Sequence, residues 1–203
     1  DRYRPLYHFF RQNFSQVTNP PIDSLRENKV MSLKTRFGNL GNILDFNTLT
    51  EENIYVLESP ILSNTQFEKF KNYFKENIYI INCTFSVEQS LEEALNYIKK
   101  EAEIAVRQGF TQIVLTDKNV SDNKLPIPIL LAVGAINTYL IKLKLRGYAS
   151  INVQTGDAMD THSFATIIGV GATTVNPYLA FDSLYQRYNK KLFGNFEFDE
   201  CVK

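Results

Sequence analysis

The sequence predicts an α/β fold of about five βα units with parallel strands, preceded by an irregular helical N-terminal arm over residues 1–50. Short apolar segments rich in Ile, Val and Tyr alternate along residues 51–203 with longer segments whose apolar residues recur at helical spacing. The strand-like segments are mostly apolar rather than alternating, which is typical of a parallel sheet covered on both faces. Glycine and proline mark most boundaries between them.

The first two units follow the arm, whose own helix is predicted from Leu6, Phe9, Phe10 and Phe14. Strands are predicted at 52–59 (ENIYVLES) and 78–85 (IYIINCTF), and helices at 64–76 and 90–108. The second helix has the clearest pattern, because one apolar stripe faces a charged side and Gly109 ends it.

Three further units complete the set. The remaining strands are predicted at 111–117, 149–155 and 173–177, with a loop at 119–126. The remaining helices are predicted from Pro126 or Pro128 to Gly147, near 160–168, and from Tyr178 onward. Five units cannot close an eight-stranded barrel, so we expect an open or partial sheet with right-handed crossovers, and the arm packed across one end.

Polar residues stand where the predicted strands end. The carboxyl ends of parallel strands meet at one edge of a sheet, which is where α/β proteins bind ligands. These residues are Asn82, Thr84, Asp117, Gln154, Thr155 and Asn176. Asp157, Asp160 and His162 follow one strand and form a candidate acid/base group. The alternative, which the pattern favours, is that these acids belong to the first turn of a helix.

Composition argues against several classes of function. Lys+Arg and Asp+Glu both number 22, and without a basic stripe the sequence does not indicate nucleic-acid binding. No apolar run approaches the roughly 18 residues that a membrane-spanning helix needs. Cys83 and Cys201 lie far apart without a ligand motif, so we expect two free thiols, Cys83 buried, and no zinc site.

Short motifs add no catalytic, cofactor-binding or metal residue. GVGATT (169–174) is half of a dinucleotide-binding fingerprint, but it precedes a predicted strand instead of following one. Gly169 and Gly171 are therefore interpreted as a helix end and a tight turn. The sequence contains no P-loop and no HExxH motif.

The segment QVTNPPIDSLRE (16–27) is unusually stiff. Pro20 and Pro21 fix their own φ, restrict the residue before each of them, and offer no backbone N–H. Carbonyl groups around the two prolines still need donors. Ser24 and Glu27 then form an S-x-x-E capping box, which predicts the start of a short helix.

Long motifs carry a resemblance to a known family. FFRQNFSQVTNPPIDSLRENKVMSL (9–33) resembles the glutamate synthase segment that reads roughly FRQ-x-F-x-QVTNPPID-x-x-RE-x-x-VMSL. The resemblance continues through 38–44, 58–62, 116–137 and 153–184, so it covers essentially the whole chain. The matching part of that enzyme is its central domain, which joins an N-terminal glutamine amidotransferase domain to an FMN-binding synthase domain.

The resemblance implies that 1–203 is a single central domain, a rudimentary TIM-barrel-like relative of the neighbouring synthase barrel, and a fragment of a longer chain. The initial Asp in place of Met agrees with this. No cofactor is implied for this segment, whereas FMN and an iron–sulfur cluster serve the parent enzyme, which makes L-glutamate from L-glutamine and 2-oxoglutarate. The implied partners are the two adjacent domains, and the implied compartment is the cytoplasm or a plastid. The electron donor, ferredoxin or a nicotinamide, is decided outside this segment.

Some residues depart from the family pattern. A histidine-rich stretch usually stands where this chain has Ile136 to Tyr139, and Gln154, Asp157 and Ser163 replace the usual acids and a histidine. These losses fit a family whose chemistry lies in the flanking domains.

The resemblance also suggests a role for the stiff segment. Ammonia released at the glutaminase site must reach the synthase site without escaping, and a rigid backbone rich in acceptors suits the wall of that path. The candidate residues are Thr18, Asn19, Pro20 and Pro21 for the ammonia channel, and Asp23 and Arg26 for domain interfaces. A plain irregular linker is the alternative. The alternative function is an autonomous TIM-barrel-like enzyme or small-molecule-binding domain that uses strand-end residues near Asp157 and His162.

Overall fold

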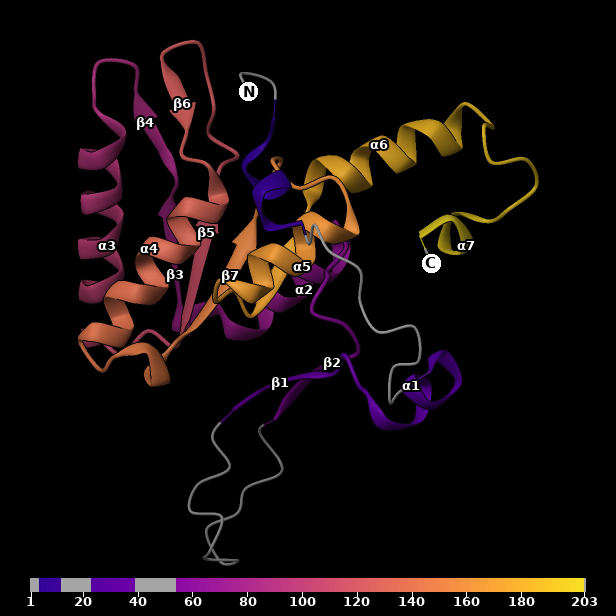
Figure 1. The fold of residues 1–203 in the computed structure, drawn as a ribbon, viewed down its shortest axis with the longest axis horizontal. Helices are drawn as coiled ribbons and strands as arrows, with labels where there is room; N and C mark the ends of the chain where they lie inside the picture. The colour runs from indigo at the N-terminus through magenta and orange to yellow at the C-terminus, as the bar shows by residue number, and fades with distance from the viewer. Residues whose placement is uncertain (1–3, 12–22, 39–53, 203) are drawn as a thin grey trace, which may run out of the picture. The chain divides into compact units, whose positions relative to one another are not determined.

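A four-stranded parallel sheet lies at the centre of the computed structural model, which describes residues 4–11, 23–38 and 54–202 (Figure 1). Its strands run in the order β3-β5-β7-β8, and each pairs in parallel with its neighbour. Their bounds are Ile78–Asn82, Gln112–Thr116, Ser150–Gln154 and Thr174–Asn176. The predicted α/β class with parallel strands is confirmed, and the sheet is open.

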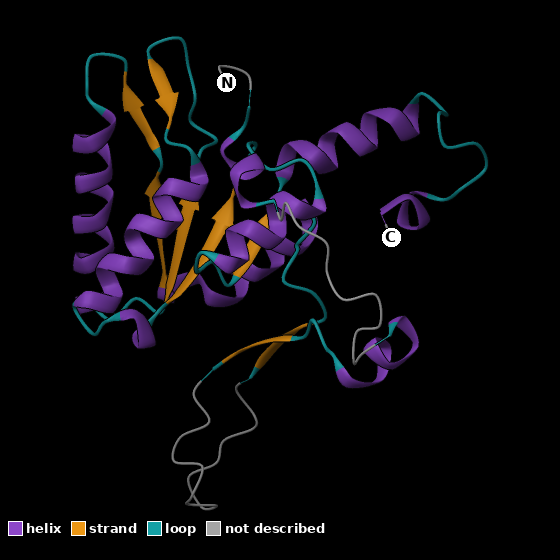
Figure 2. Ribbon diagram, viewed as in Figure 1, coloured by secondary structure: helices purple, strands orange, loops and turns teal. Residues whose placement is uncertain are grey.

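Helices α3 (Leu91–Arg107), α4 (Ile129–Lys142) and α5 (Thr161–Gly169) cover one face of the sheet (Figure 2). Aliphatic side chains from these helices and from the strands form the main core. Helix α2 (Asn64–Phe74) begins near one edge of the sheet, where the N–H of Leu62 donates to the carbonyl of Val175 in β8. The helix then leads to β3 at the opposite edge. It therefore crosses the sheet, and its Phe67 and Phe70 are buried outside the main core cluster.

The helix ends follow the chemistry that the sequence indicates. Ser63 and Ser90 cap α2 and α3 in reciprocal capping boxes with Gln66 and Glu93. Gly109 ends α3 with φ +95°, a conformation that favours glycine. Helix α4 ends earlier than predicted, at Lys142 instead of near Gly147. The chain then turns through Lys144 at φ +60°, and the 3-10 helix η4 (Arg146–Tyr148) follows.

The strand predicted at 52–59 does not join the parallel sheet, which is a correction to the five-unit prediction. Its centre, β2 (Tyr55–Leu57), pairs antiparallel with β1 (Thr35–Phe37). In both strands the middle residue is exposed and the residues on either side of it are half-buried or buried, as in a pair covered on one side only, whereas β5 is buried at every position. Among the described residues, Ile61 is the first along the chain to pair with a strand of the parallel sheet, through a single parallel bridge to Val175.

The strand predicted at 78–85 divides at Cys83, which is a second correction. Its last part, β4 (Thr84–Ser86), pairs antiparallel with β6 (Lys124–Pro126), a segment predicted as loop. The physical reason is that β5 ends at Thr116, so the chain beyond Cys83 has no parallel neighbour and bonds to the returning segment. Cys83 links the parallel sheet to the β4–β6 pair. Its N–H donates to the carbonyl of Thr116, at the end of β5, and its carbonyl accepts from the N–H of Ile127, just after β6, both at 2.8 Å.

Shorter elements lie outside the central layers. The predicted N-terminal helix is a 3-10 helix, η1 (Leu6–Phe10), which buries Tyr7 and leaves Phe9 and Phe10 exposed. Another 3-10 helix, η3 (Lys75–Asn77), follows α2. Helices α6 (Tyr178–Asn189) and α7 (Phe198–Val202) end the chain. None of the helices in the described ranges is long and apolar enough to cross a membrane.

The chain forms two compact units. Asp1–Phe10 and Ile61–Lys203 make up the first, which contains the parallel sheet. Arg11–Pro60 make up the second, in which α1 (Ser24–Val30) and the β1–β2 pair are described.

Candidate functional site

The carboxyl edge of the sheet brings together residues that follow three strands. Asp117, directly after β5, is buried and accepts hydrogen bonds from the Thr155 hydroxyl at 2.5 Å and the Gly156 N–H at 3.1 Å. Thr155 and Gly156 directly follow β7, so the parallel pairing of β5 and β7 places them beside the carboxylate. Asp117 and Thr155, predicted from the sequence as strand-end residues, therefore do meet.

Tyr178, the first residue of α6, is the third part of this cluster. A Cβ on residue 156 would lie 2.6 Å from Leu179 Cδ1 and 3.0 Å from the Tyr178 hydroxyl, so glycine leaves room for both side chains. Burial and the neighbouring Asp117 carboxylate raise the pKa of Tyr178 to about 12. The Lys118 ammonium lies 5.0 Å from the centre of the same ring. The phenol therefore stays neutral beside the Asp117 carboxylate.

Asp157 and His162 both bind Tyr7. The Tyr7 hydroxyl donates to the Asp157 carboxylate at 3.1 Å, and His162 Nε2 lies 2.8 Å from the Tyr7 carbonyl oxygen. A carbonyl only accepts, so Nε2 carries the proton. Burial, followed by the charge of Asp157, raises the pKa of Tyr7 far above its ordinary value. The two residues anchor η1 to the carboxyl edge of the sheet.

Asp160 is the N-cap of α5. Its carboxylate accepts from the Ser163 N–H at 2.8 Å and from the Ser163 hydroxyl at 2.5 Å. The capping interpretation of this acid is confirmed. Asp157 and His162 of the candidate acid/base group thus hold Tyr7, whereas Asp160 caps a helix, and no hydrogen bond known for the described residues joins the three side chains to one another.

The other predicted strand-end residues form a row across the sheet. Thr116 donates to Gln154, Gln154 donates to Asn176, and Asn176 donates to the Leu62 carbonyl and to Asn64, with distances of 2.9 to 3.1 Å. A second row further back joins Gln112, Asn152 and Thr174. These side chains satisfy one another, so they hold the strands together instead of presenting donors to a ligand. At the β3 edge, the Thr84 hydroxyl donates to the side-chain oxygen of Asn82 at 3.1 Å. This is the one side-chain hydrogen bond known for these two among the described residues.

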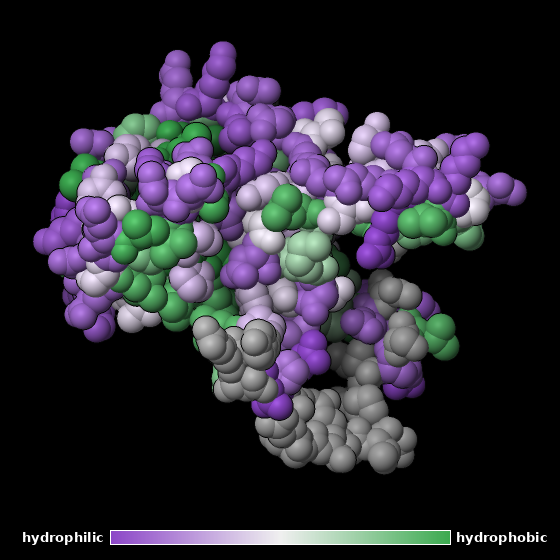
Figure 3. All heavy atoms as spheres, turned by 90° about the horizontal axis from the view of Figure 1, so that it is seen from above, coloured by the Kyte–Doolittle hydropathy of each residue, from purple (hydrophilic) through white to green (hydrophobic). Residues whose placement is uncertain are grey.

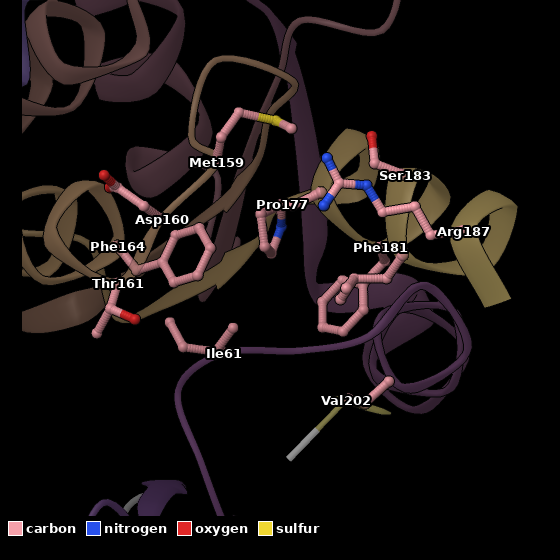
Figure 4. Close-up of a pocket in the computed structure, with 12 residues that line it drawn as sticks. Ile61, Met159, Asp160, Thr161, Phe164, Pro177, Phe181, Ser183, Arg187 and Val202 are labelled. Carbon is pink, nitrogen blue, oxygen red and sulfur yellow. The ribbon is translucent and has the colours of Figure 1, made fainter. Parts of the chain in front are cut away.

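Two clefts open near this edge. One, of about 390 Å³, is lined by the cluster itself together with the segment from Pro126 to Pro128, and both Asp117 and Asp157 contribute to its wall. The other, of about 340 Å³, lies between α5 and α6 (Figure 4). Phe164 and Phe181 stand on opposite sides of it, and Ile61 lies between them. Within the described ranges, no three His, Cys, Asp or Glu side chains are placed to hold a metal ion.

The stiff segment is only partly described. Thr18, Asn19, Pro20 and Pro21 lie outside the described residues. Asp23, and not Ser24 as the capping box predicts, is the N-cap of α1, because its carboxylate accepts from the N–H groups of Leu25 and Arg26. An Asp side chain in extended backbone reaches these two amides directly, which makes it the better cap. Arg26 also pairs with Asp23 at 3.6 Å, with both side chains exposed.

Sequence reasoning missed Tyr7, Gly156 and Tyr178. Tyr7 belongs to an aromatic stretch in which the phenylalanines, not the tyrosine, carried the helical pattern. The one available signal for Gly156 was its position between a predicted strand end and the two acids of QTGDAMD (154–160). A contact over 150 residues, such as Tyr7 to Asp157, has no local signal at all.

Comparison with known proteins places the chain in one family. The family model described as "Glutamate synthase central domain" matches residues 1–201. The chain is 50% identical over 198 residues to "Glutamate synthase [NADPH] large chain" of Azospirillum brasilense, which covers 96% of this chain and 13% of that protein. It is 38% identical to the Bacillus subtilis protein of the same description, over 94% of this chain and 12% of that protein. It is 41% identical to "Ferredoxin-dependent glutamate synthase, chloroplastic" of Spinacia oleracea, over 89% of this chain and 12% of that protein. The chain thus spans about an eighth of the length of these relatives.

Proposed function

Because the chain belongs to the glutamate synthase central domain family, we propose that it connects a glutamine amidotransferase domain to an FMN-binding synthase domain in one polypeptide. The parent enzyme would form L-glutamate from L-glutamine and 2-oxoglutarate. Its compartment would be the cytoplasm, or a plastid in a photosynthetic eukaryote, since one relative is described as chloroplastic. Relatives described with NADPH, NADH and ferredoxin match the same segment, so the electron donor is set elsewhere.

One observation carries the proposal that this segment is a scaffold without a catalytic site of its own. The two titratable side chains with the strongest claim to acid/base chemistry, Asp157 and His162, are both engaged by Tyr7. Asp117, the buried carboxylate at the strand ends, is held by Thr155 and Gly156. Contacts of this kind fix the carboxyl edge in place, as a connecting domain requires. They support the scaffold over the autonomous enzyme.

The residues at the carboxyl edge do not fit FMN. A flavin phosphate needs backbone N–H groups that point at it, and the Gly156 N–H is directed to the Asp117 carboxylate. Asp117 and Asp157 line the cleft at this edge, and two carboxylates would repel a phosphate. An iron–sulfur cluster needs several thiolates, whereas the chain has two cysteines, with Cys83 buried in the core and Cys201 in α7. We therefore assign FMN and the cluster to other domains of the parent enzyme.

We also propose that Thr18 to Pro21 contribute to the wall of the ammonia path. Two consecutive prolines keep the backbone from rearranging, and the adjacent carbonyls and the Thr18 hydroxyl offer acceptors to neutral ammonia. The segment leads into α1, whose first turn is fixed by Asp23. Asp23 and Arg26 are exposed and are proposed to meet a neighbouring domain.

The test uses the full-length parent enzyme. Thr18→Leu narrows the proposed path, and Pro21→Gly softens it; Thr65→Leu, on an exposed position of α2, makes the same chemical change elsewhere. We expect glutamine hydrolysis to continue in all three variants. The glutamate formed per glutamine consumed should fall in the first two and stay normal in Thr65→Leu. If the ratio is normal in all three, residues 16–23 are an ordinary linker, and Pro21→Gly will show only a modest loss of stability.

A further inference from the structure

Helices α4 and α5 have an unusual outer side. Neither residues 129–141 nor residues 161–181 contain an Asp, Glu, Lys or Arg. The two helices are neighbours on the same face of the sheet (Figure 1). Apart from Lys142, the last residue of α4, their exposed residues are apolar or small: Leu131, Thr138 and Ile141 on α4, and Thr161, Ala165 and Gly169 on α5. A helix without charges on its outer side is normally buried on that side as well.

Helix α3 lies on the other side of α4 and differs in this respect. Its exposed positions include Glu92, Glu93, Lys100 and Arg107, as expected for a helix that faces water. Since α3 and α4 belong to the same layer, the difference does not come from depth in the fold.

The uncharged surface continues onto η1, which contacts α5. Phe9 and Phe10 are 66% and 53% exposed there, although the neighbouring Tyr7 anchors the same helix to the protein. Figure 3 shows that hydrophobic (green) side chains reach the surface of the unit between hydrophilic (purple) ones. Two neighbouring exposed phenylalanines beside α5 form a surface typical of protein interfaces.

We propose that this surface packs against an apolar layer from another domain of the same polypeptide. We call it the α4–α5 face and define it by Leu131, Gly134, Thr138, Ile141, Ala165 and Gly169, with Phe9 and Phe10 at its border. The small residues let another backbone approach closely, and the lack of charge between Ile129 and Ile141 keeps the cost of desolvation low. This inference rests on the proposed function, in which the chain is one domain among several.

The length of the relatives favours this occupant. They are about eight times as long as the chain, so most of such a polypeptide lies outside it. A domain tethered in the same polypeptide is present at an effective concentration in the millimolar range for short flexible linkers, far above that of a second molecule. A second copy of the chain is the competing occupant, and the test separates the two.

Ile141 and Ile104 provide an internal comparison without mutation. They are the same residue type, lie on α4 and α3, and are 56% and 46% exposed in this unit. Hydroxyl-radical footprinting of the full-length enzyme, read by mass spectrometry, should oxidise Ile141 at least about fivefold more slowly than Ile104. Equal rates would overturn the proposal. They would leave the scaffold role intact, because that role is tested separately by the ratio of glutamate to glutamine.

Dilution identifies the occupant. Protection of Ile141 by a tethered domain should persist when the enzyme is diluted until mass photometry shows only monomers. Protection that disappears together with an oligomer would assign the face to a second copy and overturn the proposal.

A pair of variants gives a second readout. Thr138→Glu places a charge on the α4–α5 face, and Asn96→Glu places the same charge on an exposed position of α3. In the full-length enzyme we expect Thr138→Glu to lower the thermal unfolding midpoint, whereas Asn96→Glu and Thr138→Val leave it unchanged. Identical midpoints for the two glutamate variants would contradict a covered face.

Discussion

The two faces of the central sheet are built from the same strands but from different chemistry. Toward α3, α4 and α5, the strands present aliphatic side chains, such as Ile113, Ile151 and Val175, with Tyr79 at the edge. Toward α2, they present two rows of amides and hydroxyls together with Val114 and the β3 residues Ile78 and Ile80. The two polar rows and the aliphatic residues named above are buried, and no described side-chain polar atom that is buried lacks a hydrogen-bond partner.

The chemical difference between the two faces suggests that one face mainly supplies stability and the other mainly sets the strand register. Aliphatic contacts are non-directional, so the apolar face tolerates small shifts between strands. The amide rows are directional, because a slip of one residue would place Asn152 against aliphatic side chains on the opposite face. We infer that the apolar face supplies most of the folding free energy and the polar face fixes which residues pair. The following predictions test this division, from the largest effect to the smallest.

Truncation on the apolar face should have the largest effect. Ile151 is wholly buried in the centre of the sheet, so Ile151→Ala loses transfer free energy and leaves a cavity. We expect the free energy of unfolding to fall by about 4 kcal/mol. Urea titration followed by circular dichroism measures the loss. Ile151→Val, the matched conservative change, should cost about 1 kcal/mol.

Breaking a polar row should cost slightly less. Asn152→Leu keeps the volume but removes the acceptor of Thr174 and the donor to Gln112. We expect a loss of about 3 kcal/mol, because two buried groups remain unpaired. Replacing the whole row (Gln112→Leu, Asn152→Leu, Thr174→Val) should restore most of it. A triple variant as unstable as the single one would show that the row itself supplies stability and would contradict the division.

Cys83 shows what a titratable group does on the apolar side. Burial, followed by the charge of Asp117, raises the pKa of its thiol to about 12 from an ordinary value of 9.0. The neutral form is the one that folds, so its contribution is present below pH 9 and is lost as the pH rises from about 9 to 12. The free energy of unfolding should decline less steeply in Cys83→Ala over this range. Cys201→Ala, outside the core, should follow the unmodified protein, and the same steepness in both variants would refute the assignment.

The smallest effect is expected at a polar contact outside the sheet. Asp160→Ala removes the cap of α5 but leaves its amides near water, so we expect about 1 kcal/mol. Asp160→Asn keeps a capping oxygen and should cost less. If Asp160→Ala lowers the free energy of unfolding as much as Asn152→Leu, burial does not explain the difference between polar contacts inside and outside the sheet.

The sequence alone predicted most local features. Periodicity located α2, α3 and the four parallel strands, and the residues that stop or cap helices, such as Gly109 and Asp160, were recognised by their chemistry. It also predicted free thiols at Cys83 and Cys201 and a buried Cys83. Resemblance of long motifs indicated the family that the comparisons confirm.

Pairing between distant segments was decided only by the tertiary structure. Nothing local shows that Tyr55 to Leu57 pair with the arm, or that β6 returns to β4, because a short strand takes whichever partner has free backbone groups. The role of Asp157 and His162 depended in the same way on Tyr7, about 150 residues away. The sequence gives the type of each side chain, but whether that side chain acts as a catalytic acid or base or as a structural contact depends on which residues lie against it in the folded protein.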